Sequence, residues 1–124
     1  MTKTAPLKPA NVFPDLLTGN WKHLVFEAFR PGIEICELLG NDGDATQPSM
    51  ALLRYAPGAT VPLHRHHGVE TILVLEGEQS DERGSYPAGT VVINQPDTIH
   101  SVQSVGGCVV LIQWDRPVEI LASP

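Results

Sequence analysis

The chain has 124 residues, 42% of them hydrophobic, and a formal net charge of −6 at pH 7. This length suits one domain with a single core. The acidic balance argues against nucleic acid and against an anionic membrane surface as partners. No apolar run approaches the roughly 18 residues that a membrane span needs, and the N-terminus lacks the apolar segment of a signal peptide, so we expect a cytoplasmic protein.

The first part of the chain, residues 1–19, is rich in proline, which predicts an extended N-terminal arm before a domain over residues 20–124. The rest consists of short, alternating, β-branched segments separated by glycine and proline, which favours an all-β sandwich or barrel. Strands are predicted, in chain order, at 21–29, 33–40, 49–56, 63–67, 69–76, on both sides of a hairpin turn at Arg83–Gly84, and at 90–94, 98–105 and 108–114.

The most informative stretch is residues 58–77, PGATVPLHRHHGVETILVLEG with its leading proline. His64 and His66 are two residues apart, so on a strand they project from the same face. Gly68 allows a turn after which Glu70 could return beside the two imidazoles. Together with His100 they form a ligand set for a divalent transition metal, with Fe(II), Zn, Ni and Mn all open. The alternative is a polar interior in which the histidines are hydrogen-bonded and hold no metal.

The same residues carry a family resemblance. The spacing G-x5-H-x-H-x3-E-x6-G, the first motif of the cupins, is matched in full by Gly58, His64, His66, Glu70 and Gly77. Five fixed positions over twenty residues rarely coincide by chance on a strand–turn–strand pattern. The chain is therefore identified as a member of the cupin superfamily.

The second cupin motif is matched in part, by Gly89 and His100, whereas Gln95, Asp97 and Ser104 replace its usual proline, glycine and asparagine. Residues 20–118 resemble most the cupin domain of ChrR-type anti-sigma factors and small dioxygenase-like cupins related to acetylacetone-cleaving enzymes. The resemblance implies a double-stranded β-helix, or jelly-roll barrel, that is usually dimeric. It also implies a metal near the barrel mouth, held by the three histidines and the glutamate of the motifs.

Two functions follow from this resemblance. The first is a metal-dependent oxygenase that acts on a small carbonyl or diketone-type compound. The second is a metal-binding sensor or ligand-binding module that performs no turnover. A full anti-sigma role is not expected, because residues 1–57 hold only Cys36 and His23 as candidate ligands for the separate zinc site of such factors.

Pocket residues are predicted from strand register. If Gly106–Gly107 forms a two-residue hairpin turn, Gln113 lies opposite His100 and points into the barrel, while Cys108 lies on the outer face. By the same alternation Val102 points inward with His100, and Ile72 and Val74 follow Glu70 inward. Arg54 is a further candidate, as an anchor for an anionic substrate, although a solvated arginine is the commoner outcome.

The remaining residues are predicted to have ordinary structural roles. Asp81 and Glu82 are expected to form a solvated hairpin tip, and Asp97 either orients a ligand imidazole or caps a turn. Cys36 and Cys108 are expected to be buried, reduced thiols. The segments VVI and VVLI are apolar on both strand faces, so the outer face of the barrel must be covered. We expect a second subunit to cover it, with the N-terminal arm laid across it, and therefore predict a homodimer.

Overall fold

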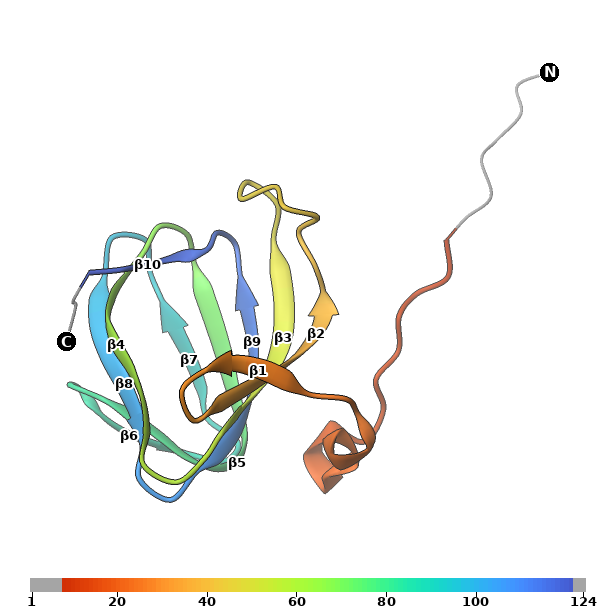
Figure 1. The fold of residues 1–124 in the computed structure, drawn as a ribbon, viewed down its shortest axis with the longest axis horizontal. Helices are drawn as coiled ribbons and strands as arrows, with labels where there is room; N and C mark the ends of the chain where they lie inside the picture. The colour runs from red at the N-terminus through yellow and green to blue at the C-terminus, as the bar shows by residue number, and fades with distance from the viewer. Residues whose placement is uncertain (1–7, 122–124) are drawn as a thin grey trace.

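The computed structural model describes residues 8–121, which form a β-barrel with an N-terminal segment that leads away from it (Figure 1). Two short 3₁₀ turns precede the barrel, η1 (Leu16–Thr18) and η2 (Asn20–His23). The ten strands of the described part are β1 (Glu27–Arg30), β2 (Ile33–Leu39), β3 (Ser49–Tyr55), β4 (Ala59–His66), β5 (Glu70–Asp81), β6 (Gly84–Pro87), β7 (Val91–Asn94), β8 (Ile99–Ser104), β9 (Cys108–Trp114) and β10 (Val118–Ile120). The all-β prediction is confirmed.

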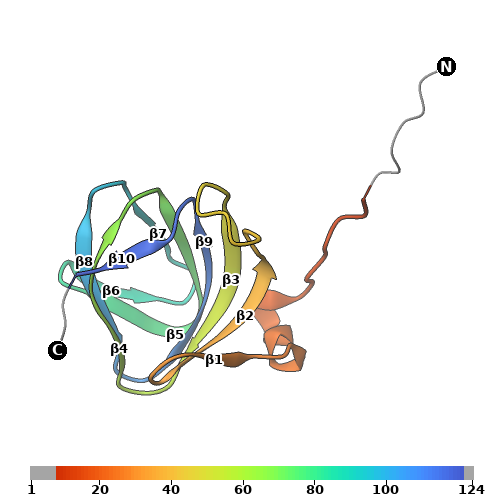
Figure 2. The same ribbon diagram turned by 45° about the horizontal axis from the view of Figure 1, so that its top comes forward.

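The strands form two antiparallel sheets that curl around one interior (Figure 2). The first sheet runs β1-β2-β3-β9-β5-β7, and the second runs β10-β4-β8-β5-β6. β5 belongs to both sheets, because its first part pairs with β7 and β9 and its last part pairs with β6 and β8. β1, β2 and β3 are neighbours in the first sheet, and from β3 onward consecutive strands alternate between the two sheets, as in a jelly roll.

A glycine marks the point where β5 passes from one sheet to the other. The register of β5 against β9 shifts between Val74 and Glu76, and Gly77 directly after it has a φ of +74°. Strands that change sheets bend at such bulges, and a positive φ favours glycine there. A Cβ atom at Gly77 would also overlap the carbonyl oxygen of Gly107. The corner of the barrel thus needs a residue without a side chain.

Two apolar clusters lie on the two faces of the first sheet. The inner cluster fills the barrel and includes Val74 and Val110, both fully buried. The outer cluster joins Leu52 and Val109 to Trp21 of η2, which is only 5% exposed. The prediction that something covers the outer face is therefore met in part by the chain's own N-terminal segment. The extended residues 8–15 lead away from the barrel in Figure 1.

Two sequence-based element predictions were wrong, and one strand was missed. Residues 21–29 form a 3₁₀ turn and only a short strand, because Trp21 packs on the sheet instead of joining it. β10 was not predicted. β8 and β9 do not pair as a hairpin: β8 lies between β4 and β5, whereas β9 lies between β3 and β5, so the Gly106–Gly107 turn links the two sheets. Among the described residues, none of the helices has the length and hydropathy needed to span a membrane.

Candidate metal centre

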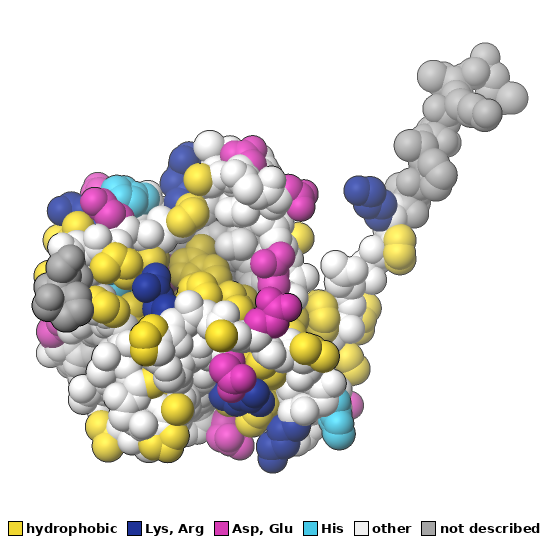
Figure 3. Space-filling model, viewed as in Figure 1, with side chains coloured by type: hydrophobic (Ala, Val, Ile, Leu, Met, Phe, Trp, Pro, Cys, Tyr) yellow, Lys and Arg dark blue, Asp and Glu magenta, His cyan; other side chains and the backbone are white. Residues whose placement is uncertain are grey.

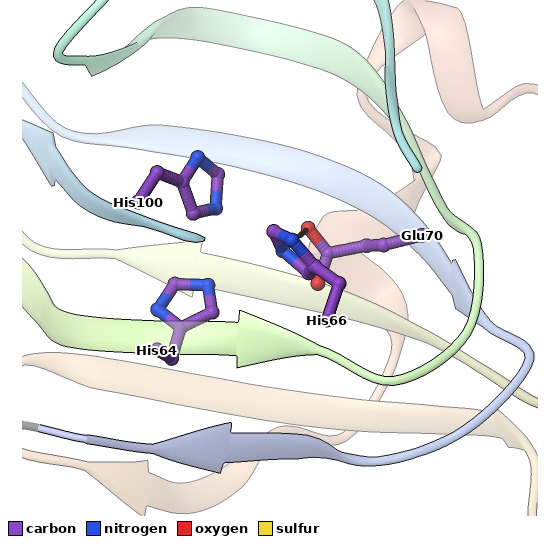
Figure 4. A group of neighbouring side chains, drawn as sticks. All are labelled: His64, His66, Glu70 and His100. Atoms are coloured by element: carbon purple, nitrogen blue, oxygen red, sulfur yellow. Dashed lines mark ion pairs between the residues drawn. The ribbon is translucent and has the colours of Figure 1, made fainter. Parts of the chain in front are cut away.

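Three histidines and one glutamate converge inside the barrel (Figure 4). His64 and His66 project from the same face of β4, and His100 on β8 lies directly opposite His64. Glu70 is the first residue of β5, reached after a short turn from His66. All four side chains are buried, and one potential ligand atom from each lies within 4.8 Å of the others. This grouping is what the motif spacing predicts.

Each imidazole is held through its Nδ1 atom. The Nδ1 atom of His64 lies 2.8 Å from the Pro62 carbonyl oxygen, which can only accept, so this nitrogen carries the proton. The Nδ1 atom of His66 lies 2.9 Å from the Thr98 hydroxyl. The third ring contacts a carboxylate: the Nδ1 atom of His100 lies 3.0 Å from Oδ2 of Asp81. Protonation of Nδ1 leaves Nε2 as the atom with a lone pair for a metal.

The Nε2 atoms of His66 and His100 are buried and make no hydrogen bond among the described residues, although Nε2 of His66 lies 3.2 Å from Oε1 of Glu70. A buried polar atom without a partner is costly and uncommon. The three rings pack edge to face, with centroids 4.6 to 5.0 Å apart. This arrangement fits a divalent cation, which would supply the missing partner for these nitrogens.

Glu70 is held from both neighbouring strands. Asn94 on β7 and Trp114 on β9 lie directly opposite it, and they donate to its Oε1 at 3.0 Å and its Oε2 at 2.9 Å. Burial alone would favour the neutral acid, but His66, at 3.2 Å, and the two other histidines outweigh it and lower the pKa of Glu70. Burial lowers the pKa of His64. Both shifts favour an ionised carboxylate and a neutral imidazole, the states that bind metal.

A cavity opens beside this cluster, and the side chains of His64 and Glu70 are part of its lining. Figure 3 shows the corresponding face, where a hollow is lined with hydrophobic side chains. The aliphatic lining residues are Leu53, Val61, Ile72, Val102, Ile112 and Val118. Phe29 and Trp114 add aromatic surface, and Arg30, Tyr55 and Gln79 are the other polar members. A small, mainly apolar molecule would therefore lie next to the cluster.

The predicted pocket residues meet different outcomes. Ile72 and Val102 line the cavity, and Val74 is fully buried in the inner cluster. The prediction for Gln113 is wrong: it lies on the face of β9 opposite to Ile112 and donates to Asp115 at 2.7 Å. The reason is the absent hairpin, because β9 pairs with β3 and β5 instead of β8. The same error put Cys108 outside, whereas it belongs to the inner cluster.

Arg54 lies on the outer side of β3 and does not line the cavity. Its guanidinium forms an ion pair with Glu34 at 2.9 Å and lies 4.1 Å from the centre of the Phe26 ring. Arg54 alternates with Leu53 and Tyr55, which face inward, so its side chain must face outward. The proposed anchoring of a substrate by Arg54 is therefore wrong.

Sequence reasoning missed Asp81, which was expected to be solvated. Its side chain is 2% exposed and accepts hydrogen bonds from Tyr86 and from the backbone of Arg83, besides its contact with His100. These bonds outweigh burial and lower the pKa of Asp81. Of the two alternatives left open for Asp97, the structure shows the turn, where its φ is +67°. Nothing in the local sequence distinguishes the two aspartates; only the curl of β5 brings Asp81 to His100.

Replacing Asp81 by asparagine is expected to weaken divalent-metal binding by about 10- to 100-fold, because the carboxylate that orients and polarises the His100 ring is lost. The measurement is a competition titration against a chromophoric chelator. Asp97→Asn is the matched control, since asparagine tolerates the positive φ and Asp97 contacts no histidine ring of the cluster. Equal affinities in the two variants would contradict the role given to Asp81.

The jelly-roll barrel and its inward histidine–glutamate cluster define the chain as a cupin. Residues 16–116 match the family described as the ChrR cupin-like domain, and the chain belongs to this family.

Known proteins share the sequence or the fold. The chain is 34% identical to the anti-sigma-E factor ChrR of Cereibacter sphaeroides over 73 residues, which cover 56% of this chain and 34% of the relative. It thus matches about a third of that relative's length. The structure of Rhodobacter sphaeroides SigE in complex with the anti-sigma ChrR aligns with a TM-score of 0.62 and 26% identity, over 72% of this chain and 47% of the other. An acetylacetone dioxygenase from Acinetobacter johnsonii shares the fold, with a TM-score of 0.74 and 12% identity over 99% of this chain and 84% of the other.

Proposed function

We propose that the protein is a metal-dependent oxygenase that acts on a small carbonyl or diketone-type compound. The observation that carries the proposal is the apolar cavity that reaches His64 and Glu70 of the cluster. A molecule held there would have its polar end against the metal ligands and its carbon skeleton against aliphatic walls. The likeness in fold to an acetylacetone dioxygenase supports this choice.

The proposed ligands are the Nε2 atoms of His64, His66 and His100 and a carboxylate oxygen of Glu70. A bound transition ion would supply Lewis acidity toward a carbonyl oxygen and, where it is redox-active, reactivity with dioxygen. The chain's own residues keep the imidazoles neutral and oriented, keep Glu70 ionised between Asn94 and Trp114, and exclude water with apolar walls. Iron, manganese, nickel and zinc all suit such a mixed set of nitrogen and oxygen ligands.

The test is oxygen uptake by protein loaded with Fe(II), Mn(II), Ni(II) or Zn(II), recorded with an oxygen electrode in the presence of pentane-2,4-dione. The proposal expects uptake that requires both the diketone and a redox-active ion and that is absent with zinc. Stoichiometric metal and diketone binding without oxygen uptake under any ion would contradict turnover of this compound and favour a binding module.

A second candidate function is a metal-bearing sensor or ligand-binding module without turnover. The specific observation in its favour is the 34% identity to an anti-sigma factor, a protein whose name describes regulation and not catalysis. The oxygen-uptake experiment separates the two candidates, because a sensor would bind metal and ligand without consuming oxygen.

The homodimer predicted from the sequence stays a proposal. On edge strand β7, Val91 and Ile93 are 56% and 54% exposed, and they continue the outer apolar face that η2 covers only in part. A second copy laid against them would bury this edge. Sedimentation equilibrium at twice the 13.4 kDa chain mass is the supporting result, and a single chain mass is the opposing one.

A further inference from the structure

We propose that the cavity takes a small organic acid whose carboxylate binds the guanidinium of Arg30, while a carbonyl oxygen at its other end lies toward the position where His64 and Glu70 would hold a metal ion. The inference rests on the cavity assigned above as the ligand site, and it adds the class of ligand. It replaces Arg54, which the sequence suggested for this task, by an arginine on a different strand.

A strand irregularity places Arg30 at the cavity. In a regular strand, consecutive side chains point to opposite faces. The register of β1 against β2 shifts between Ala28 and Arg30, and both Phe29 and Arg30 line the cavity. Such bulges re-aim side chains and occur often beside functional sites. The Arg30 guanidinium lies 5.3 Å from the centre of the Phe29 ring, which in turn packs 6.5 Å from the Trp114 ring.

The charge of Arg30 is not balanced within the described structure. Among residues 8–121, its guanidinium makes no ion pair and no side-chain hydrogen bond, although the residue is half-buried in a chain with a net charge of −6. Arg54, by contrast, is paired with Glu34. A guanidinium offers five donors in a planar fork that matches a carboxylate. A neutral ligand would leave these donors unused and partly desolvated.

Two more polar groups face the same cavity. Tyr55 and Gln79 are buried, and the Gln79 amide donates to the Tyr55 hydroxyl at 3.4 Å. Within residues 8–121 the Tyr55 hydroxyl donates no hydrogen bond of its own, so it is a second donor for an anionic oxygen. Burial, and after it the charges of Cys108 and Glu70, raise the pKa of Tyr55, so its hydroxyl keeps its proton. The positive charge of Arg30 acts in the opposite direction, as expected of a cation close to Tyr55.

The cavity lining therefore combines aliphatic side chains with two sets of polar groups. The histidine–glutamate cluster is one set, and Arg30 with Tyr55 is the other. A keto acid with a short carbon chain supplies an oxygen for each set and apolar surface for the aliphatic side chains. A diketone supplies an uncharged oxygen to Arg30 and so forms only the weaker, neutral hydrogen bond there.

The experiment compares 4-oxopentanoate with hexane-2,5-dione, which has a methyl ketone in place of the carboxylate. Both are titrated into ¹⁵N-labelled, chelator-treated protein, and the indole N–H signal of Trp114 reports occupancy of the cavity. We expect the acid to bind about tenfold or more tightly than the dione, as a charge-assisted hydrogen bond predicts. Arg30→Gln is expected to abolish this preference, and the matched variant Arg54→Gln to keep it.

Equal affinity for the two compounds in the wild type, or a preference that survives Arg30→Gln, would overturn the inference. If Arg30→Gln fails to give a dispersed amide spectrum, Arg30→Lys serves instead: it keeps the charge but loses the planar fork, and it is expected to reduce the preference. The titration needs no metal, so its outcome is independent of the proposed oxygenase function. A protein that binds no metal but prefers the acid would refute only the function, and turnover of a diketone without an Arg30-dependent preference would refute only the inference.

Discussion

His66→Ala is expected to reduce affinity for a divalent transition metal by more than about 100-fold, since loss of a direct ligand must cost more than the 10- to 100-fold typical of an outer partner. His66 is 1% exposed, and its Nε2 atom lies 3.2 Å from Oε1 of Glu70 but makes no hydrogen bond among the described residues. The readout is metal content per chain after purification without chelators, together with the rise in Tm on adding metal. The wild type should bind about one ion per chain and show the rise.

The matched control is His67→Ala, one residue along the chain. His67 is exposed, and its Nε2 atom lies 2.8 Å from Glu119 on β10, away from the cluster. This variant is expected to keep full metal content. Wild-type protein that takes up no metal even after reconstitution would contradict the assignment of all four ligands. A His66→Ala variant with the same metal content as the wild type would contradict the assignment of His66 alone.

Gly77→Ala is expected to lower the free energy of unfolding by about 2 to 5 kcal/mol. An alanine with a positive φ costs about 1–2 kcal/mol, and the overlap of its Cβ with the Gly107 carbonyl adds the cost of overpacking, about 1–3 kcal/mol. The neighbour on the other side is the backbone of Cys108, which cannot move without disturbing the β5–β9 pairing. Chemical denaturation followed by circular dichroism measures the change.

Gly43→Ala separates the two contributions. Gly43 has a φ of +77°, close to that of Gly77, but a Cβ there meets nothing within 4 Å. Its substitution should cost only the backbone part, about 1–2 kcal/mol. Equal losses in the two variants would show that the close approach at the barrel corner contributes nothing.

The cluster could be predicted from the sequence because its signal is local. His64, His66 and Glu70 lie within seven residues, and strand alternation with one turn is enough to bring them together. His100 followed from the family's second motif, although only part of that motif is present. The all-β class followed in the same way from short alternating segments between glycines and prolines.

What failed depends on which strands are neighbours. The Gly106–Gly107 pair is typical of a hairpin, yet here it connects two sheets. Because β8 and β9 were assumed to pair, Gln113 was predicted on the wrong face of β9. Arg30 was missed for a different reason. A bulge changes the alternation of a strand by one residue, and neither its presence nor its position is visible in a single sequence.

The course of β5 through both sheets has a consequence for how the barrel comes apart. Its first residue, Glu70, and its last, Asp81, reach the same cluster, one beside His66 and the other beside His100. The contacts of Glu70 with His66 and of Asp81 with His100 can both form only when β5 has curled through both sheets. An ion bound in the cluster would therefore stabilise only the fully folded barrel. It would lower the unfolding rate and leave the folding rate unchanged.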